Sequence, residues 1–298
     1  MKRALLSLLA VLAVTSGCGR PENSGSGRQV IENKGSDTLV NVAQAWAEAY
    51  QTVDPNVAVA VTGGGSGTGI AALINGTVDI ANSSREMSDE EKANAVANNH
   101  TPVEHTVGYD ALAVYLHKDN PLQSVSLEQL AGVYGEGGTI EKWDQLGVTV
   151  PGCPSGEIIR ISRQNNSGTY EYFREAVLQE EDFKMGSRDM HGSKDVVDLV
   201  MDTPCAIGYS GLAYATDEVH MPCVTDAAGQ CITPSMQTAI DRTYPIARPL
   251  FMYTDGQPEG HVKSYMDWIL SDVGQCIIAD KGYAPYRPVQ CPTPTAAQ

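Results

Sequence analysis

The chain has 298 residues, of which 42% are hydrophobic and 19% are charged, a composition typical of soluble globular proteins. This length is generous for one compact domain and comfortable for two, so we expect two lobes. The chain is acidic, with 36 Asp and Glu against 20 Lys and Arg. This balance argues against nucleic acid as a partner, since binding to a phosphate backbone relies on clustered positive charge. It does not exclude a small, buried anion.

The N-terminus has the pattern of an export signal. A basic start precedes an apolar run, residues 4–14, that is too short to span a membrane as a stable helix. The run ends in Thr-Ser-Gly-Cys, which resembles the bacterial lipobox, whose Cys is acylated and becomes the first residue. We therefore expect a signal peptide over residues 1–17, a lipid on Cys18 and a flexible tether over residues 18–29. An ordinary secretory peptide that is cut nearby is the alternative.

After the tether, short apolar strands alternate with amphipathic helices, which predicts an α/β fold with mostly parallel sheets. Apolar residues recur at helical spacing over 39–50, and Asp37 or Thr38 would cap this helix. Next, an alternating strand over 57–61 runs directly into a Gly-rich turn at 63–69. Later strands are expected over residues 78–81, 107–116, 157–162, 206–209 and 245–253.

Two of these strands are long enough to connect two lobes. The stretch 107–116 would cross from one lobe to the other, and the stretch 245–253 would return. We therefore predict that lobe one comprises residues 30–107 and 248–298, and that lobe two comprises residues 108–247.

Seven cysteines divide into Cys18 and six others. An even number in an exported chain is consistent with three disulfides. None of the six forms a CxxC, so we expect no metal site. Closeness along the chain favours the pairs Cys223–Cys231 and Cys276–Cys291, which leaves Cys153 with Cys205, although the sequence leaves other pairings open.

Three predicted strand-to-helix turns share one composition: residues 35–39, 63–69 and 163–169 are rich in Gly, Ser, Thr and Asn. The first turn of a helix leaves backbone N–H groups unpaired, and its aligned peptide dipoles place partial positive charge there. Gly lets an anion approach the backbone, and Ser or Thr adds a hydroxyl donor. Each turn alone is better explained as a capped helix. Together, the three turns predict a site for one tetrahedral oxyanion.

Arg163 is the most informative residue of these turns. Its guanidinium offers forked donors that match two oxygens of a phosphate group. A surface ion pair with Glu171 or Asp182 is the alternative role. The Ser-Gly-Thr sequence that follows at 167–169 favours the anion site.

The turns belong to several ordered blocks that extend over residues 30–287. They include GSDTL at 35–39, GGGSGTG at 63–69, SRQNNSGTY at 162–170 and YPIARPLFMYT at 244–254. In these blocks the chain resembles the phosphate-binding proteins of the bacterial high-affinity phosphate ABC importer, which have the type II periplasmic binding-protein fold. The resemblance implies two α/β lobes, a hinge of crossing strands, and a dehydrated anion between the lobes.

The resemblance also implies the residues that contact phosphate. Carried over position by position, they are Thr38, Leu39, Ser66, Ser84, Arg163, Ser167, Gly168 and Thr169. Ser84 stands where well-known members have an Asp that accepts the proton of phosphate, which ionised sulfate lacks. Either Asp37 or the Ser84 oxygen would take this role, with Asp37 as an N-cap the alternative. Ser36 and Arg85 are further candidates, Arg85 as additional positive charge.

The partners implied by the resemblance are inorganic phosphate and the membrane subunits of an ABC importer. The protein would be a monomer, attached by its lipid to a membrane in the periplasm or at the cell surface, without cofactor, metal or enzymatic activity. Binding of another oxyanion, such as sulfate, molybdate or a phosphonate, stays an alternative on the same fold.

A phosphate-ester hydrolase with Ser66 or Ser167 as nucleophile is the second alternative. The chain has no G-x-S-x-G elbow, no HExxH and no P-loop, which argues against it. Residues 67–72 fit the G-x-G-x-x-A form of the dinucleotide fingerprint, but this match is isolated and the chain is predicted to be exported.

Overall fold

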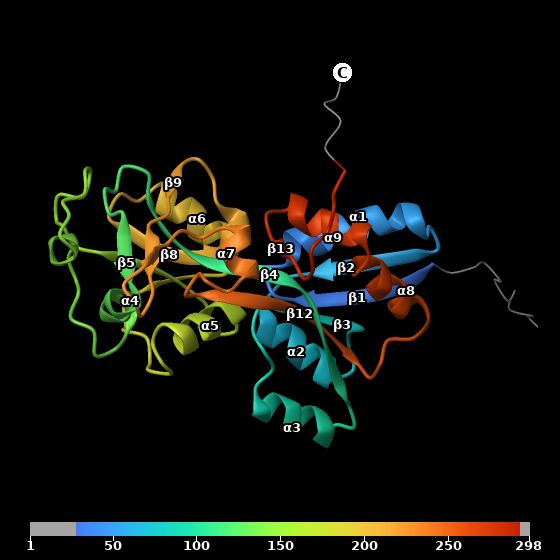
Figure 1. Ribbon diagram of the computed structural model, residues 1–298. Helices are drawn as coiled ribbons and strands as arrows, with labels where there is room; N and C mark the ends of the chain where they lie inside the picture. The colour runs from blue at the N-terminus through green and yellow to red at the C-terminus, as the bar shows by residue number, and fades with distance from the viewer. Residues whose placement is uncertain (1–27, 293–298) are drawn as a thin grey trace, which may run out of the picture.

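The structure is a computed structural model that describes residues 28–292. Two α/β halves lie side by side and share one path of strands (Figure 1). The strand order is β2-β1-β3-β12-β4-β8-β6-β7, with β9 and β13 paired to β4. A separate three-stranded sheet has the order β11-β10-β5. The predicted two-lobed α/β fold is confirmed.

The elements alternate along the chain as the apolar patterns predict. The strands are β1 Gln29–Gly35, β2 Val57–Thr62, β3 Ile80–Ser83, β4 Pro102–His117, β5 Ser124–Ser126, β6 Ile159–Arg163, β7 Arg188–Met190, β8 Ala206–Gly211, β9 Val219–His220, β10 Cys223–Thr225, β11 Cys231–Ile232, β12 Ala247–Asp255 and β13 Ala284–Pro285. The helices are α1 Val40–Val53, α2 Ser66–Ile74, α3 Asp89–Ala97, α4 Leu127–Tyr134, α5 Gly168–Ala176, α6 Ser193–Met201, α7 Met236–Ile240, α8 Gly260–Ile269 and α9 Asp272–Asp280, with 3-10 turns η1 Trp143–Leu146 and η2 Leu212–Tyr214.

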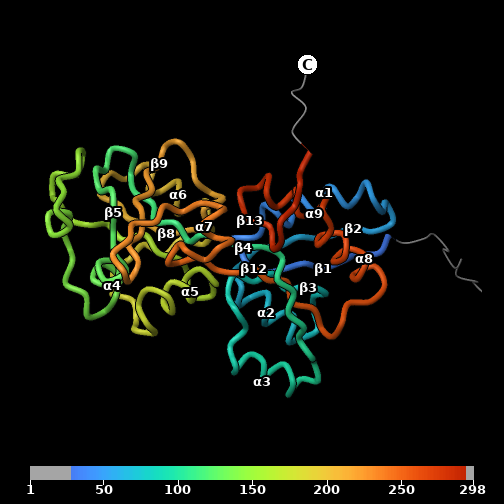
Figure 2. The backbone as a smooth tube through the Cα atoms, in the orientation of Figure 1, coloured from blue at the N-terminus to red at the C-terminus, as the bar shows by residue number. Residues whose placement is uncertain are grey.

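Strands β4 and β12 connect the two halves. They pair antiparallel from Pro102–Asp255 to Ala111–Ala247, and β4 then continues into antiparallel pairing with β8. Figure 2 shows the tube passing between the halves along these two strands. The division into lobe one (30–107 and 248–298) and lobe two (108–247) stays a prediction.

The parallel pairing of strands determines at which edge of each sheet the predicted turns lie. In one half, β1 pairs parallel with both β2 and β3, so the carboxyl ends of all three strands lie at the same edge of the sheet. In the other half, β6 pairs parallel with β7 and β8 and ends at Arg163. The turns that follow β1, β2 and β6 therefore lie where the two halves meet.

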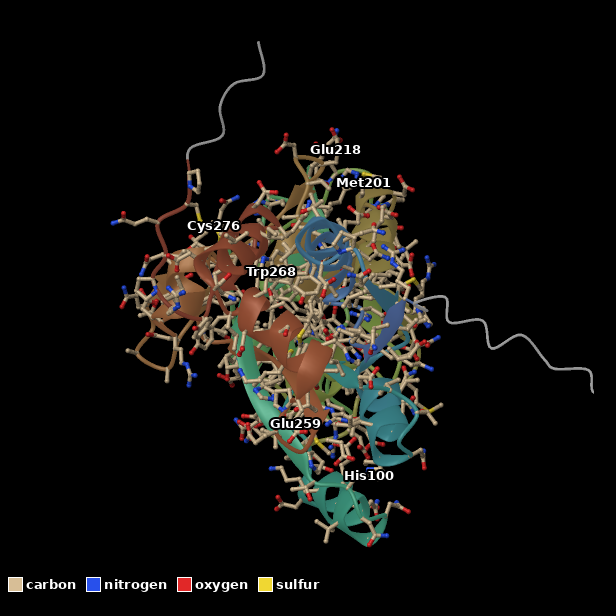
Figure 3. The ribbon with its side chains drawn as sticks, turned by 90° about the vertical axis from the view of Figure 1, so that its right-hand side faces the viewer. His100, Met201, Glu218, Glu259, Trp268 and Cys276 are labelled. Carbon is tan, nitrogen blue, oxygen red and sulfur yellow. A yellow bond between two sulfur atoms is a disulfide. The ribbon has the colours of Figure 1, made fainter. Side chains whose placement is uncertain are left out.

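Each half has its own apolar core. In the first half, Trp46 is fully buried and its indole N–H donates to the carbonyl of Gly274 on α9 at 2.7 Å. Trp268 on α8, labelled in Figure 3, has its ring centroid 5.3 Å from that of Tyr50. In the second half, Phe173 stacks on Tyr209 with centroids 3.9 Å apart. Aromatic side chains bury large apolar areas, so these packings stabilise each half.

The start of α1 differs from the prediction. Its N-cap is Leu39, and no side chain caps the helix. Asp37 turns instead toward the Gly-rich turn, where Oδ1 accepts the N–H of Gly64 at 2.9 Å. The prediction that Asp37 or Thr38 caps the helix is therefore wrong, because a tertiary contact takes the carboxylate away from its own helix.

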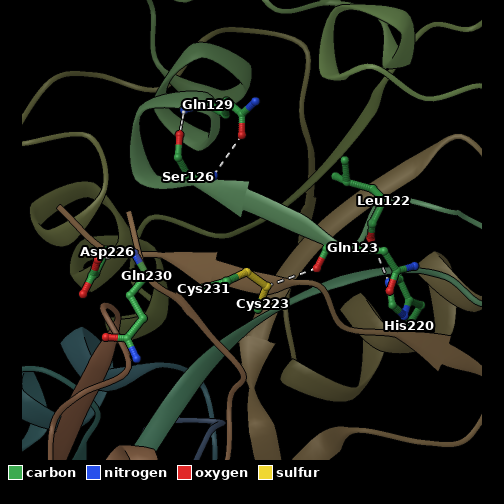
Figure 4. Close-up of a disulfide and its surroundings, with 9 residues drawn as sticks. All are labelled: Leu122, Gln123, Ser126, Gln129, His220, Cys223, Asp226, Gln230 and Cys231. Carbon is green, nitrogen blue, oxygen red and sulfur yellow. Dashed lines mark hydrogen bonds between the residues drawn. A yellow bond between two sulfur atoms is a disulfide. The ribbon is translucent and has the colours of Figure 1, made fainter. Parts of the chain in front are cut away.

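The disulfides follow the predicted pairing, two close pairs and the pair that these leave. The bonded pairs are Cys153–Cys205, Cys223–Cys231 and Cys276–Cys291. Cys223–Cys231 joins β10 to β11, and Figure 4 shows it beside Gln123, whose carbonyl accepts the N–H of Cys223 at 3.0 Å.

We expect removal of Cys153–Cys205, by replacing both cysteines with Ala, to lower the melting temperature by about 5–10 °C. The reason is that this bridge spans 52 positions and closes a long loop in the unfolded chain. The matched control removes Cys223–Cys231, which spans only 8 positions. Calorimetric melting would contradict the expectation if the control variant lost as much stability.

Candidate functional site

A cluster of buried hydroxyls lies where the two halves meet. The Oγ1 atoms of Thr38 and Thr169 are 3.0 Å apart, although the residues are separated by 131 positions. Ser84 donates its N–H to Ser66 Oγ at 3.1 Å, and Ser36 Oγ donates to Ser84 Oγ at 2.9 Å. None of the five residues is more than 2% exposed. Burying polar groups costs free energy unless they form hydrogen bonds, so a buried cluster of hydroxyls indicates a functional site.

The first turn of α5 faces these hydroxyls. A Cβ on Gly168 would collide with Ser66 Oγ and lie 2.8 Å from Ser84 Oγ, so only Gly permits this approach. Ser167 is the N-cap of α5, and its Oγ accepts the N–H of Thr169 at 3.1 Å. The positive end of the helix dipole therefore points toward the hydroxyl cluster.

Asn166, which directly precedes the N-cap of α5, connects this helix start to the Gly-rich turn at 63–69. Its carbonyl accepts the N–H of Gly67 at 3.0 Å, and its side-chain Nδ2 donates to Gly64 O at 3.0 Å and Thr68 Oγ1 at 3.3 Å. The N-cap of α2, Gly65, has no side chain to cap the helix. A residue of the second half therefore satisfies an N–H at the start of a helix in the first half.

Arg163 is buried at the end of β6, with 1% of its side chain exposed. Its Nη1 donates to Ser193 Oγ at 3.0 Å, and its Nη2 donates to His191 O at 2.8 Å and to Asp37 Oδ2 at 3.4 Å. Burial lowers the pKa of the guanidinium, and the Asp37 charge opposes this. An arginine stays protonated even so. The ion pair crosses between the halves, and the alternative surface pair is not formed.

A second guanidinium, which the sequence did not point to, reaches the hydroxyls directly. Arg248 on β12 donates from Nη2 to Thr38 Oγ1 at 3.3 Å and to Thr169 Oγ1 at 3.1 Å. Asp110 on β4 holds it, with Oδ2 2.8 Å from Nη2 and 3.2 Å from Nε. Burial raises the pKa of Asp110, and the charge of Arg248 opposes this. The sequence signal that could have found this pair was a single charged residue in each of two otherwise apolar stretches, 107–116 and 245–253.

Two predicted contacts are engaged elsewhere. The N–H of Leu39 donates to Ser36 O at 3.1 Å, inside its own turn. Arg85 forms a two-pronged pair with Glu91, at 2.7 Å for both oxygens, so its charge is directed away from the hydroxyls. The structure brings together the other candidates, Ser36, Thr38, Ser66, Ser84, Gly168 and Thr169, with Asp37, Arg163 and Ser167 at the edge of the cluster.

Two lobes with a polar, donor-rich junction between them define a solute-binding protein of the type II periplasmic class. Between residues 28 and 292, no helix has the length and apolarity to cross a membrane, and no three His, Cys, Asp or Glu side chains are grouped to hold a metal ion.

Comparisons with known proteins agree with this class. The model of the PBP superfamily domain matches residues 21–273. The phosphate-binding protein PstS of Pseudomonas aeruginosa is 32% identical over 268 residues, covering 86% of this chain and 82% of that protein. Protein SphX of Synechococcus elongatus is 30% identical, covering 96% and 86%.

Solved structures show the same relationship. A Clostridium perfringens protein, assigned as a phosphate ABC transporter substrate-binding protein and solved with bound phosphate, has a TM-score of 0.76 at 27% identity. The similarity covers 87% of this chain and 100% of that one. The chain therefore belongs to the PBP superfamily, within its PstS-like branch, as the resemblance of the sequence blocks implies.

Proposed function

We propose that the protein captures inorganic phosphate between its lobes and delivers it to an ABC importer. The observation that carries this proposal is the meeting of Thr38 and Thr169, one from each lobe, at 3.0 Å in a buried cluster of donors. Hydroxyls, guanidinium groups and a helix N-terminus are the groups that suit a tetrahedral oxyanion. The relatives named PstS, and the C. perfringens structure with bound phosphate, support this choice of ligand.

The proposed ligand residues offer different kinds of donor groups to phosphate. Arg163 supplies guanidinium N–H donors, and the start of α5 supplies backbone N–H groups next to the hydroxyls. Leu39 would contribute its N–H only by releasing Ser36 O. The full proposed set is Thr38, Leu39, Ser66, Ser84, Arg163, Ser167, Gly168 and Thr169.

The proposed mechanism is closure of the two lobes about β4 and β12. Contacts that cross between the lobes, Asn166 with the Gly-rich turn and Arg163 with Asp37, belong to the closed state. Opening would break them and admit the anion, and closing would bury it. Burial excludes water, which strengthens each hydrogen bond to the anion. The closed form then presents both lobes to the importer.

Binding without catalysis is supported by the surroundings of the two serines considered as nucleophiles. A serine nucleophile needs an adjacent general base. Ser66 Oγ contacts the N–H and the hydroxyl of Ser84, and Ser167 Oγ accepts the N–H of Thr169. In the described part of the chain, neither hydroxyl is bonded to a His or a carboxylate.

We also propose export and attachment to a membrane, in the periplasm or at the cell surface, as a monomer. The predicted signal peptide (1–17), Cys18 and nearly all of the predicted tether (18–29) lie outside the described residues, and β1 begins at Gln29. Three disulfides support a compartment outside the reducing cytoplasm.

Titration calorimetry of the mature protein tests the function. We expect about one phosphate bound per chain, with weaker binding of sulfate and molybdate, and no hydrolysis of a chromogenic phosphate ester. If sulfate or molybdate bound more tightly than phosphate, that anion would replace phosphate as the proposed ligand. Ester turnover that disappears in Ser66→Ala or Ser167→Ala would replace it with the hydrolase.

A further inference from the structure

The two crossing strands each bring one charged side chain into an apolar setting. Arg248 and Asp110 are directly opposite each other in the register of β12 and β4. Their side chains are 0% and 1% exposed. Replacing a buried ion pair with apolar residues is often neutral or stabilising, so stability alone is a weak reason for this pair.

The donors of Arg248 point to a role in the site. A guanidinium has five N–H groups. Asp110 Oδ2 accepts two, Ser84 O accepts one from Nη1 at 3.2 Å, and the hydroxyls of Thr38 and Thr169 share another. Among the described residues, this leaves one Nη1 hydrogen for a ligand. Through Thr38 and Thr169, Arg248 contacts the proposed ligand-binding turns of both lobes at once.

Asp110 fixes where that guanidinium lies. Its Oδ2 bonds both Nε and Nη2 of Arg248, and its Oδ1 accepts the N–H of Leu212 at 3.1 Å. A Cβ on Gly211 would lie 2.9 Å from Asp110 Oδ2 and 3.3 Å from Thr38 Cγ2, so the missing side chain of Gly211 leaves the space against which the Asp110 carboxylate packs.

Each guanidinium near the hydroxyls is matched by one carboxylate. Arg163 faces Asp37 at 3.4 Å, and Arg248 faces Asp110 at 2.8 Å. The site therefore offers directed hydrogen-bond donors with little net charge. Such a site recognises the geometry and protonation of an anion more than the size of its negative charge.

We propose that Arg248 is an anion-binding residue of the interlobe site, and that Asp110 positions its guanidinium and cancels its charge, which disfavours sulfate relative to phosphate. This inference rests on the proposed phosphate function. It assigns the selectivity to Asp110, whereas the sequence pointed to Asp37 or Ser84.

Calorimetry with inorganic phosphate, and competition by sulfate, test the two roles separately. Arg248→Gln removes the charge and the fork, and is expected to weaken phosphate binding about tenfold or more. Asp110→Asn leaves the guanidinium uncancelled, so the ratio of phosphate to sulfate affinity is expected to fall about tenfold. The matched controls are Arg287→Gln and Asp272→Asn, an Arg–Asp pair at the protein surface, which should change neither quantity.

Wild-type affinity in Arg248→Gln would overturn the binding role, and an unchanged ratio in Asp110→Asn would overturn the selectivity role. If the unaltered protein failed to bind phosphate, the proposed function itself would be wrong. This outcome is distinct from a failure of the variants to show the expected changes.

Because breaking a buried pair destabilises a fold, a second measurement uses the unaltered protein. The guanidinium nitrogen resonances of Arg248 should shift when phosphate is added, whereas those of Arg287 should not. Unshifted Arg248 resonances at saturating phosphate would overturn the proposal without any variant having to fold.

Discussion

Arg163→Ala is expected to weaken phosphate binding about a hundredfold, which corresponds to about 2.7 kcal/mol. The substitution removes a buried guanidinium and leaves Asp37 without the cation that it faces. An uncompensated carboxylate would then lie next to a dehydrated anion. The contact of Arg163 with Asp37 also crosses between the lobes, so its loss weakens the closed form. Titration calorimetry measures the change.

The matched control for Arg163 is Arg160→Ala, on the same strand. Arg160 pairs with Glu141 at 2.8 Å and has no bond to the hydroxyl cluster. We expect the control variant to bind phosphate as the unaltered protein does. An Arg163→Ala affinity within a few fold of that of the control would remove Arg163 from the site.

Gly65→Ala is expected to prevent the lobes from closing and thereby to weaken phosphate binding about a hundredfold. A Cβ on Gly65 would lie 2.5 Å from the carbonyl oxygen of Asn166, which belongs to the opposite lobe. Nothing flexible can yield there, because that oxygen is backbone and already accepts the N–H of Gly67. Small-angle scattering with and without phosphate should show no compaction in this variant.

Gly64→Ala separates closure from local strain. Gly64 and Gly65 both have positive φ, at +113° and +89°, so either substitution strains the turn. A Cβ on Gly64, however, would meet nothing closer than Thr68 Cγ2 at 3.8 Å. We expect Gly64→Ala to lose stability but still to compact with phosphate. Equal loss of compaction in both variants would show that turn strain, and not the interlobe contact, is responsible.

Much of the site could be predicted because its residues are adjacent in sequence. The turns that contain Thr38, Ser66 and Thr169 each follow a short apolar strand, and each has the small and hydroxylated residues that helix starts use. In parallel strands the carboxyl ends share an edge, so the turns after β1 and β2 converge once those strands pair. The turn after β6 belongs to the other half and meets them through contacts between the halves, such as that of Thr38 with Thr169. Two cysteine pairs, Cys223–Cys231 and Cys276–Cys291, were predictable for the same local reason, and they left Cys153 to pair with Cys205.

Arg248 and Asp110 could not be predicted in this way. They lie 138 positions apart, and each is the one charged residue in its predicted apolar stretch, 107–116 or 245–253. Their contact depends on the register of β4 against β12, which shifts between Leu250 and Phe251. A shift of one residue turns a side chain to the other face of a sheet, so composition and spacing do not determine that these two side chains meet.

The side-chain partners of Asp37 also depended on the packing of distant segments. Asp37 was expected to cap its own helix, yet it bonds Gly64 and faces Arg163. Periodicity and turn composition were sufficient for the α/β class, the crossing strands and the three donor-rich turns, because these depend on neighbours within one or two turns of chain. Which charges meet, and which carboxylate faces which guanidinium, followed only from the tertiary structure, because these hydrogen bonds join residues more than 100 positions apart.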